Sequence, residues 1–129
     1  MSHFLSEGVP ARPTAVICDD DPMTRRLVRE IAARCGYDIV AGVDNAIDAL
    51  NLVLEHHPDV LVLDLALQGL RGEDIIESIL ECGSTRIIVH SSYDPRYALK
   101  SGARMFASKG NIKVLEKMLL KVIGVEVSA

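Results

Sequence analysis

Three consecutive carboxylates, Asp19, Asp20 and Asp21, directly follow a short apolar run, Thr14–Cys18, and precede Pro22. The apolar run predicts a buried strand and Asp-Pro predicts the first turn of a helix, so the acids stand where a strand leaves the core. Like charges held that close repel strongly at a low effective dielectric constant unless a cation lies among them. The acidic run therefore indicates a divalent metal site.

Three further polar residues, Asp64, Ser91 and Lys109, stand where other apolar segments end. Carboxylate oxygens together with water suit Mg²⁺, and a carboxylate beside bound Mg²⁺ can attack phosphorus to give an acyl phosphate. A lysine and a hydroxyl can then neutralise charge on the oxygens of the transferring phosphoryl group. Aspartate is already ionised at neutral pH, so this chemistry needs no general base.

The spacing of apolar residues predicts strands that alternate with helices. The expected strands are Thr14–Asp19, Tyr37–Val43, Val60–Asp64, Arg86–Ser91 and Arg104–Ser108. The expected helices are Pro22–Cys35, one capped by Asp44 or Asn45, one after the loop Ala66–Gly72, one from Asp94 to Gly102, and one capped by Asn111. Consecutive βα units favour an α/β fold with an open parallel sheet and helices on both faces. In such folds the ligand site lies at the carboxyl ends of the strands.

Some residues near these motifs have structural interpretations. Asp21 is predicted to cap the first helix rather than to bind metal, and Met23, Leu27 and Ile31 are predicted to form the buried face of that helix. His90, on an apolar strand, is predicted to be a hydrogen-bonded core histidine.

Composition narrows the class of protein. The 129 residues are 49% hydrophobic but only 4% aromatic, with no Trp, which suits one domain with an aliphatic core around a parallel sheet. A net charge of −4 argues against a nucleic-acid partner, and no run is long and apolar enough to span a membrane or to act as a signal peptide. Cys18, Cys35 and Cys82 lack C-x-x-C spacing and are predicted to be reduced residues of a cytoplasmic protein.

Four segments, VICDDDP, VLVLDL, IIVHSS and FASKG, occur in this order on the expected elements, so that the stretch from Thr14 to Ile123 resembles a response-regulator receiver domain of two-component signalling. The resemblance implies a flavodoxin-like doubly wound fold with five strands in the order 2-1-3-4-5 and five helices. We expect a tail at 1–13, the domain at 14–123 and a second tail at 124–129.

The resemblance also implies a function. The chain would be a stand-alone switch that takes a phosphoryl group from a sensor histidine kinase or a histidine phosphotransfer protein. Its output would pass to an unknown downstream protein by contact or onward phosphotransfer, and it would be no enzyme beyond its own phosphorylation and dephosphorylation. Whether it forms a homodimer stays open.

In the family's pattern Asp64 corresponds to the phosphoacceptor. The implied Mg²⁺ ligands are Asp19, Asp20, Asp64 and the backbone carbonyl of Ala66. The implied phosphate-binding residues are Ser91 and Lys109.

Other positions follow or depart from the family's pattern. Ser91 and Phe106 match its switch pair. Ala66 and Tyr93 occupy the positions that tune hydrolysis of the acyl phosphate, and neither offers a carboxylate or amide to orient water, which implies a long-lived phosphoryl state. Gly110 stands where the family usually has a proline in a cis peptide. A non-proline cis bond costs about 3 kcal/mol, so the family's loop geometry is not carried over here.

Two other functions are compatible with parts of the sequence. A small phosphatase of the haloacid-dehalogenase type would use Asp19 as nucleophile and Asp21 as acid/base. Against it, Met23 stands where that family has Thr or Val, no later acidic pair supplies the metal, and the chain is short. A phosphorylation-independent binding module, in which the acids have no role, is the third alternative.

Overall fold

The computed structural model describes residues 11–69, 71–92, 96 and 102–125. One parallel sheet has the strand order β2-β1-β3-β4-β5, which confirms the predicted fold class and strand order. The strands are β1 (Thr14–Cys18), β2 (Asp38–Val43), β3 (Val60–Leu63), β4 (Arg86–Ser91) and β5 (Met105–Ser108). The helices within the described residues are α1 (Pro22–Arg34), α2 (Ala46–His56), α3 (Gly72–Glu81) and α5 (Ile112–Val122). The helix predicted at Asp94–Gly102 falls mainly on 94–95 and 97–101, outside the described residues.

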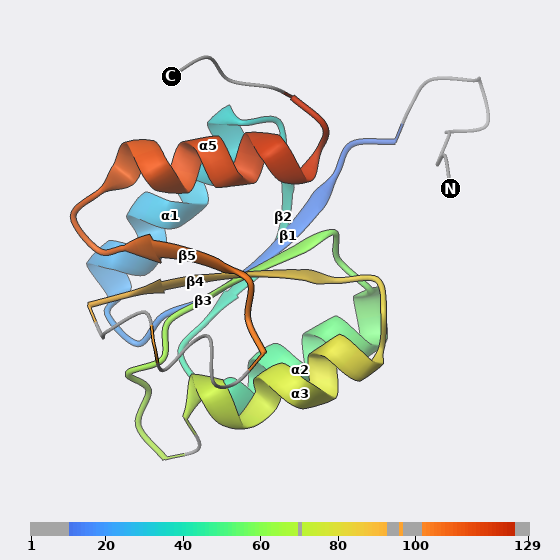
Figure 1. Ribbon diagram of the computed structural model, residues 1–129, viewed down its shortest axis with the longest axis vertical. Coiled ribbons are helices and arrows are strands. Elements are labelled where there is room, and N and C mark those ends of the chain that lie inside the picture. The colour runs from blue at the N-terminus through green and yellow to red at the C-terminus, as the bar shows by residue number, and fades with distance from the viewer. Residues whose placement is uncertain (1–10, 70, 93–95, 97–101, 126–129) are drawn as a thin grey trace.

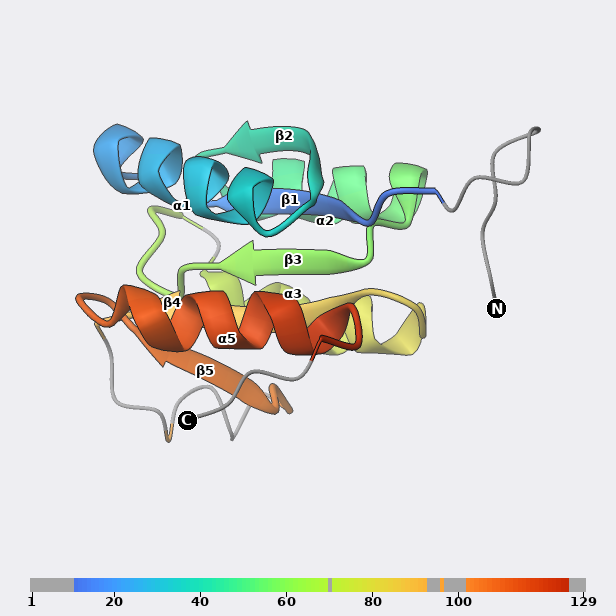
Figure 2. The ribbon, with the colours of Figure 1, turned by 90° about the horizontal axis from the view of Figure 1, so that it is seen from above.

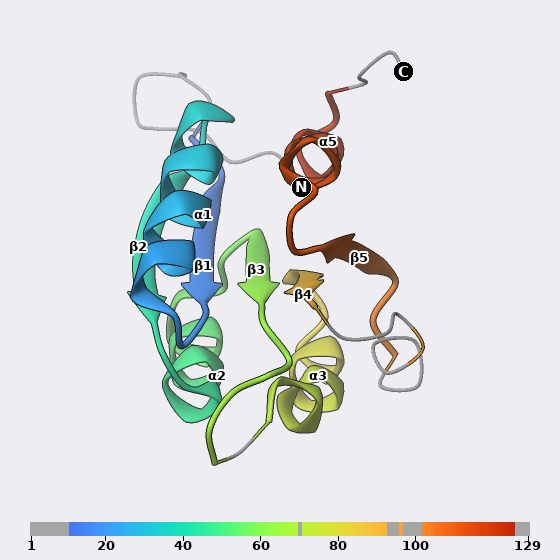
Figure 3. The same ribbon diagram turned by 90° about the vertical axis from the view of Figure 1, so that its left-hand side faces the viewer.

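The helices cover both faces of the sheet. Helices α1 and α5 lie on one face, and α2 and α3 lie on the other (Figures 1 and 3). Alternate residues of each strand point to opposite faces, so Ile17 and Ile88 pack in the core beneath α1 and α5, while Leu61 and Val89 pack in the core beneath α2 and α3. The central strand β3 is buried along its whole length, as expected for a strand covered on both sides. Figure 2 shows α1 and α5 side by side along the sheet.

Side-chain caps set where the helices begin. Asp21 accepts a hydrogen bond from the N–H of Thr24, which confirms its predicted role as the N-cap of α1. Asn45, rather than Asp44, caps α2, and Asn111 caps α5 as predicted. Capping satisfies N–H groups that have no partner inside a helix.

The predicted buried face of α1 is wrong for two of its three residues. Met23 is 81% exposed and Leu27 is 40% exposed, whereas Val28, Ile31 and Ala32 are buried. The residues Val28, Ile31 and Ala32 have the i, i+3, i+4 spacing of a single helix face, and Met23 and Leu27 lie outside it. Of the predicted face only Ile31 therefore belongs to the core.

Four strands are one residue shorter than predicted. Strands β1 and β3 end before Asp19 and Asp64, and strands β2 and β5 begin after Tyr37 and Arg104. These single-residue differences place the two acids in the loops that leave the carboxyl edge of the sheet. No helix in the described part of the chain is long and apolar enough to cross a membrane.

Candidate functional site

Backbone hydrogen bonds position the two acids that follow β1 and β3. The N–H of Asp19 donates to the carbonyl of Val43 at 3.0 Å, and the N–H of Asp64 donates to the carbonyl of Cys18 at 2.9 Å. Each residue is therefore still held to a neighbouring strand although it stands beyond its own. Both aspartates are only 2% exposed. Two buried carboxylates thus meet at the carboxyl edge of the sheet, where open α/β sheets bind ligands.

Lys109, directly after β5, reaches both of these acids. Its Nζ lies 2.9 Å from Oδ2 of Asp64 and 3.1 Å from Oδ2 of Asp19. Its backbone N–H donates to the carbonyl of Ser91 at 3.0 Å, which ties the loop after β5 to the end of β4. Burial by itself lowers the pKa of Lys109, but the hydrogen bond to Asp64 and the negative charges of Asp64 and Asp19 outweigh burial and raise it. The lysine is therefore an ammonium at neutral pH.

The carboxylate oxygens have unequal hydrogen-bond partners. Oδ1 of Asp19 accepts from the N–H of Asp21 at 2.9 Å, and Oδ1 of Asp64 accepts from the N–H of Ala66 at 3.0 Å. Oδ2 of Asp19 is buried and accepts no hydrogen bond from the described residues, because Lys109 lies at ion-pair distance without hydrogen-bond geometry. Burial raises the pKa of Asp19 against the opposing effects of Asp21 and Lys109. One buried oxygen therefore still lacks a full partner.

A third carboxylate, that of Asp20, lies beside the two buried ones. Asp19, Asp20 and Asp64 each offer an oxygen, and these oxygens lie within 4.8 Å of one another. Hard oxygen donors at this spacing, one of them exposed and one without a hydrogen-bond donor, fit Mg²⁺, which binds through a few carboxylates and keeps several waters. Asp21 faces the first turn of α1 instead, where its carboxylate accepts from Thr24.

The structure places the two predicted switch residues on one face of the sheet. Ser91 ends β4 with a fully buried side chain and pairs with Ser108, while Phe106 pairs with Val89. Phe106 packs against the core beneath α2 and α3, and Ser91 follows Val89 by two residues on the same face. Ser91 and Phe106 are therefore near neighbours on adjacent strands, and Ser91 lies at the edge that holds Asp64.

The remaining predicted positions are placed in part. The backbone N–H of Ala66 contacts Asp64, whereas Tyr93 lies outside the described residues. Gly110 has φ +93°, and no peptide bond between described residues is cis. Proline is held near φ −65°, so it could not adopt this backbone, which gives a physical reason for the glycine where the family usually has proline.

His90 departs from its predicted state. It is buried, 4% exposed, but neither ring nitrogen has a hydrogen-bond partner among the described residues, so the predicted hydrogen bond is wrong. The side chain shares a sheet face with Ile88 and Ala107, which are apolar and offer no side-chain partner. Burial, with the charge of Lys109, lowers the pKa of His90. The ring is therefore neutral at pH 7.

Two residues that support the site were missed. A Cβ at Gly72 would lie 2.4 Å from the carbonyl oxygen of Asp64 and 3.0 Å from Cα of Leu65, so only glycine lets α3 begin against this loop. Arg25 donates from Nη1 to the carbonyl of Asp19 at 2.8 Å. The contact of Gly72 could have been predicted, because a glycine at the start of an amphipathic helix is unusual. Nothing in the sequence distinguishes Arg25 from its neighbouring arginines.

The sequence matches one protein family along most of its length. Residues 15–120 match the family model described as response regulator receiver domain. The chain is 32% identical over 99 residues to the virulence factors putative positive transcription regulator BvgA of Bordetella pertussis, covering 73% of this chain and 47% of that protein. It is 28% identical over 120 residues to a protein-glutamate methylesterase/protein-glutamine glutaminase of Haloarcula marismortui, covering 88% of this chain and 31% of that protein. The chain thus spans less than half the length of these relatives.

Solved structures resemble the fold along nearly the whole described chain. The signal receiver domain of the putative response regulator NarL from Mycobacterium tuberculosis superposes with a TM-score of 0.79 at 26% identity, covering 90% of this chain and 100% of that one. The response regulator domain of Thermotoga maritima CheB superposes with a TM-score of 0.77 at 19% identity, covering 91% and 100% of the two chains. The second likeness supports the fold alone.

Proposed function

Because this chain belongs to the response-regulator receiver domain family, we propose that it is a phosphoacceptor switch of a two-component phosphorelay in which Asp64 carries the phosphoryl group. The observation that carries the proposal is the meeting of Asp64, Asp19 and Lys109 at one edge of the sheet, with Nζ within 3.1 Å of both carboxylates. A buried carboxylate next to an ammonium and to a second acid that lacks a hydrogen-bond donor suits phosphoryl transfer better than a purely structural role at the end of a strand.

Phosphoryl transfer to Asp64 needs no general base from the protein. A carboxylate oxygen of Asp64 attacks the phosphorus of a phosphohistidine, an O–P bond forms, and the P–N bond breaks. The electron pair of that bond returns to the imidazole of the donor, which then takes up a proton from solvent. The N–H of Ala66 orients the carboxylate of Asp64, and Lys109 neutralises charge on the phosphoryl oxygens.

The metal proposal rests on the same acids. Asp19, Asp20 and Asp64, together with the main-chain carbonyl of Ala66, would hold Mg²⁺, whose charge would further neutralise the phosphoryl group. Two observations support this assignment: Oδ2 of Asp19 has an ion pair but no hydrogen-bond donor, and oxygens of the three acids lie within 4.8 Å of one another.

After transfer, the hydroxyl of Ser91 and the ammonium of Lys109 would bind phosphoryl oxygens, and Phe106 would rearrange with Ser91. Ala66 and Tyr93 offer no carboxylate or amide to orient an attacking water, so we propose a long-lived acyl phosphate. Ala66→Asn is then expected to shorten the phosphoryl lifetime of the folded protein. The lifetime in denaturant is the control, because there the two proteins should not differ. Equal lifetimes in the folded state would contradict the proposal.

The wider function follows from the same proposal. The donor is a sensor histidine kinase or a histidine phosphotransfer protein, and a downstream protein reads the phosphorylated state by contact or receives the phosphoryl group. We propose that residues 14–123 form this domain, that it works in the cytoplasm without binding nucleic acid, and that it catalyses only its own phosphorylation and dephosphorylation.

Intact mass measurement with Mg²⁺ and acetyl phosphate tests the acceptor. A single phosphoryl adduct on the wild type is expected, lost in Asp64→Asn and kept in Asp21→Asn, because asparagine is an equally good helix cap. Loss in Asp19→Asn with retention in Asp64→Asn would instead indicate the haloacid-dehalogenase-type phosphatase. No adduct on any protein would indicate the binding module.

A further inference from the structure

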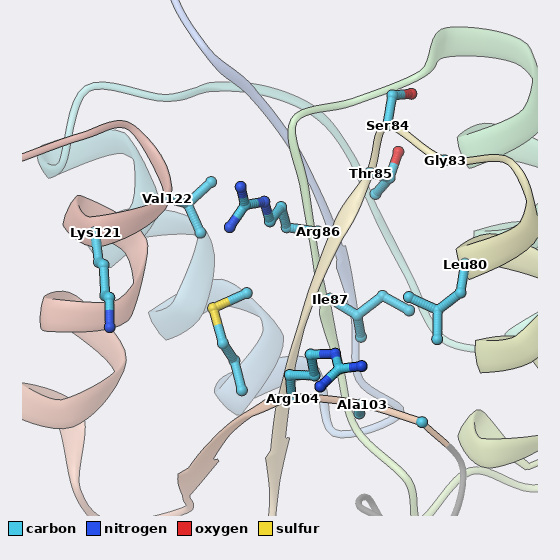
Figure 4. A pocket seen from close by; sticks show the side chains of 12 residues that line it. Leu80, Gly83, Ser84, Thr85, Arg86, Ile87, Ala103, Arg104, Lys121 and Val122 are labelled. Atoms are coloured by element: carbon cyan, nitrogen blue, oxygen red, sulfur yellow. The ribbon is translucent and has the colours of Figure 1, made fainter.

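A pocket of about 460 Å³ lies at the edge of the sheet opposite to the candidate phosphorylation site. The ends of α3 and α5 and the beginnings of β4 and β5 form its walls (Figure 4). Arg86, at the start of β4, lies five residues before Ser91, about 16 Å along the strand. A ligand in this pocket would therefore leave Asp64 accessible.

The described charged residues that line this pocket are all positively charged. Among the described residues, Arg86, Arg104 and Lys121 line it and no carboxylate does, although the whole chain has a net charge of −4. All three cationic side chains are exposed, and none makes an ion pair or side-chain hydrogen bond with another described residue. In Figure 4, Arg86 and Arg104 project between α5, which carries Lys121, and the apolar side chains opposite. Three uncompensated cations held around one hollow attract an anion.

Apolar side chains line the pocket on both sides of the sheet edge. Ile87, 3% exposed, and Leu80, 43% exposed, lie on the side of α3, and the polarisable side chain of Met105 lies on the side of α5. A volume of about 460 Å³ lies within the range of pockets that bind small molecules. Apolar surface under a cationic rim would bury a hydrocarbon body and pair its acidic group with a guanidinium.

We propose that this pocket binds a small amphipathic organic anion, with its apolar body against Leu80 and Ile87 and its carboxylate or phosphate between Arg86 and Arg104, near Lys121. Planar guanidinium groups bind such oxyanions through two parallel hydrogen bonds, which favours an anion over a neutral ligand of the same shape. The site goes beyond the proposed phosphoacceptor function and does not depend on it.

Titration of the ¹⁵N-labelled full chain without Mg²⁺, followed by NMR, tests the proposal. The probes are 4-phenylbutyrate and its neutral analogue 4-phenylbutan-1-ol. Saturable shifts are expected for 4-phenylbutyrate at Arg86, Ile87 and Arg104, with clearly weaker binding of the alcohol. The variant Arg86→Gln with Arg104→Gln should bind the anion about tenfold more weakly, since two charge-assisted contacts are lost.

The control variant carries Arg26→Gln and Lys113→Gln, which remove the same net charge from exposed helix positions outside the pocket. Its affinity for 4-phenylbutyrate should match the wild type. Equal binding of acid and alcohol, equal weakening in both variants, or shifts confined to other surfaces would overturn the proposal. Saturable binding of the acidic peptide acetyl-Glu-Leu-Glu-amide without binding of 4-phenylbutyrate would also overturn it and would assign the pocket to a protein segment.

Discussion

Removal of the Lys109 ammonium should destabilise the fold through the two acids it contacts. In Lys109→Met the flexible stem is kept, while Asp19 and Asp64, each 2% exposed, lose the cation at 3.1 Å and 2.9 Å. Carboxylate oxygens of Asp19 and Asp64 lie within 4.8 Å of each other, and two unit charges at that upper limit repel by about 3.5 kcal/mol at an effective dielectric constant of about 20. Lys109 is a quarter exposed, so solvent screens part of this energy. We expect the free energy of unfolding without Mg²⁺ to fall by about 3 kcal/mol at pH 7.

The pH dependence of this stability loss tests whether repulsion between the two acids causes it. The difference between wild type and Lys109→Met should shrink as the pH falls below the raised pKa of Asp19, because protonated acids no longer repel. The pKa of Lys109 is raised in the folded state above its ordinary value of 10.5. Its stabilising contribution is therefore complete below pH 10.5 and is lost as the pH rises through the folded-state pKa.

Urea unfolding followed by far-ultraviolet circular dichroism measures these differences. Lys113→Met, an exposed lysine of α5, is the control and should change the free energy of unfolding by less than about 0.5 kcal/mol. Mg²⁺ should recover more stability in Lys109→Met than in the wild type, since a cation then occupies a more strongly negative site. A loss at pH 7 as small as that of the control, or one independent of pH, would contradict this prediction.

Three further outcomes are expected. Gly72→Ala should cost about 2 kcal/mol in urea melts and slow phosphorylation by acetyl phosphate because its Cβ meets the Asp64 backbone; an unchanged free energy of unfolding would contradict this. Tyr37→Phe should lower the free energy of unfolding by about 1 kcal/mol in urea melts, because the buried hydroxyl donates to a main-chain carbonyl of α5 at 2.6 Å; an unchanged midpoint would contradict this. The pKa of His90 is lowered in the folded state, so its neutral ring contributes stability above the ordinary pKa of 6.5, and this stability is lost as the pH falls through the folded-state pKa. The melting temperature of His90→Leu should therefore change less than that of the wild type between about pH 7 and pH 5. An equal change in both proteins would exclude this role.

Local patterns in the sequence determined the fold and the position of the site. Apolar runs such as Val60–Leu63, too short for helices and bounded by Pro58 and a polar residue, predict buried parallel strands. The carboxyl ends of parallel strands lie at one edge, so the order of Asp19, Asp64 and Lys109 along the chain was enough to predict that they meet. Caps such as Asp21 were also predictable, because the groups that make them are three residues apart.

The partner of each side chain was decided only by the tertiary structure. The ion pairs of Lys109 with both acids, and the lack of a hydrogen-bond donor to Oδ2 of Asp19, depend on how the loops after three strands converge. The unpartnered ring of His90 depends on which residues of β5 lie beside it, and the close contact of Gly72 depends on where α3 starts over Asp64. Periodicity reports which face of an element is apolar, whereas hydrogen bonds and ion pairs depend on distances of a few tenths of an ångström between segments remote in the chain. Those distances are set by packing and strand register, which no local spacing encodes.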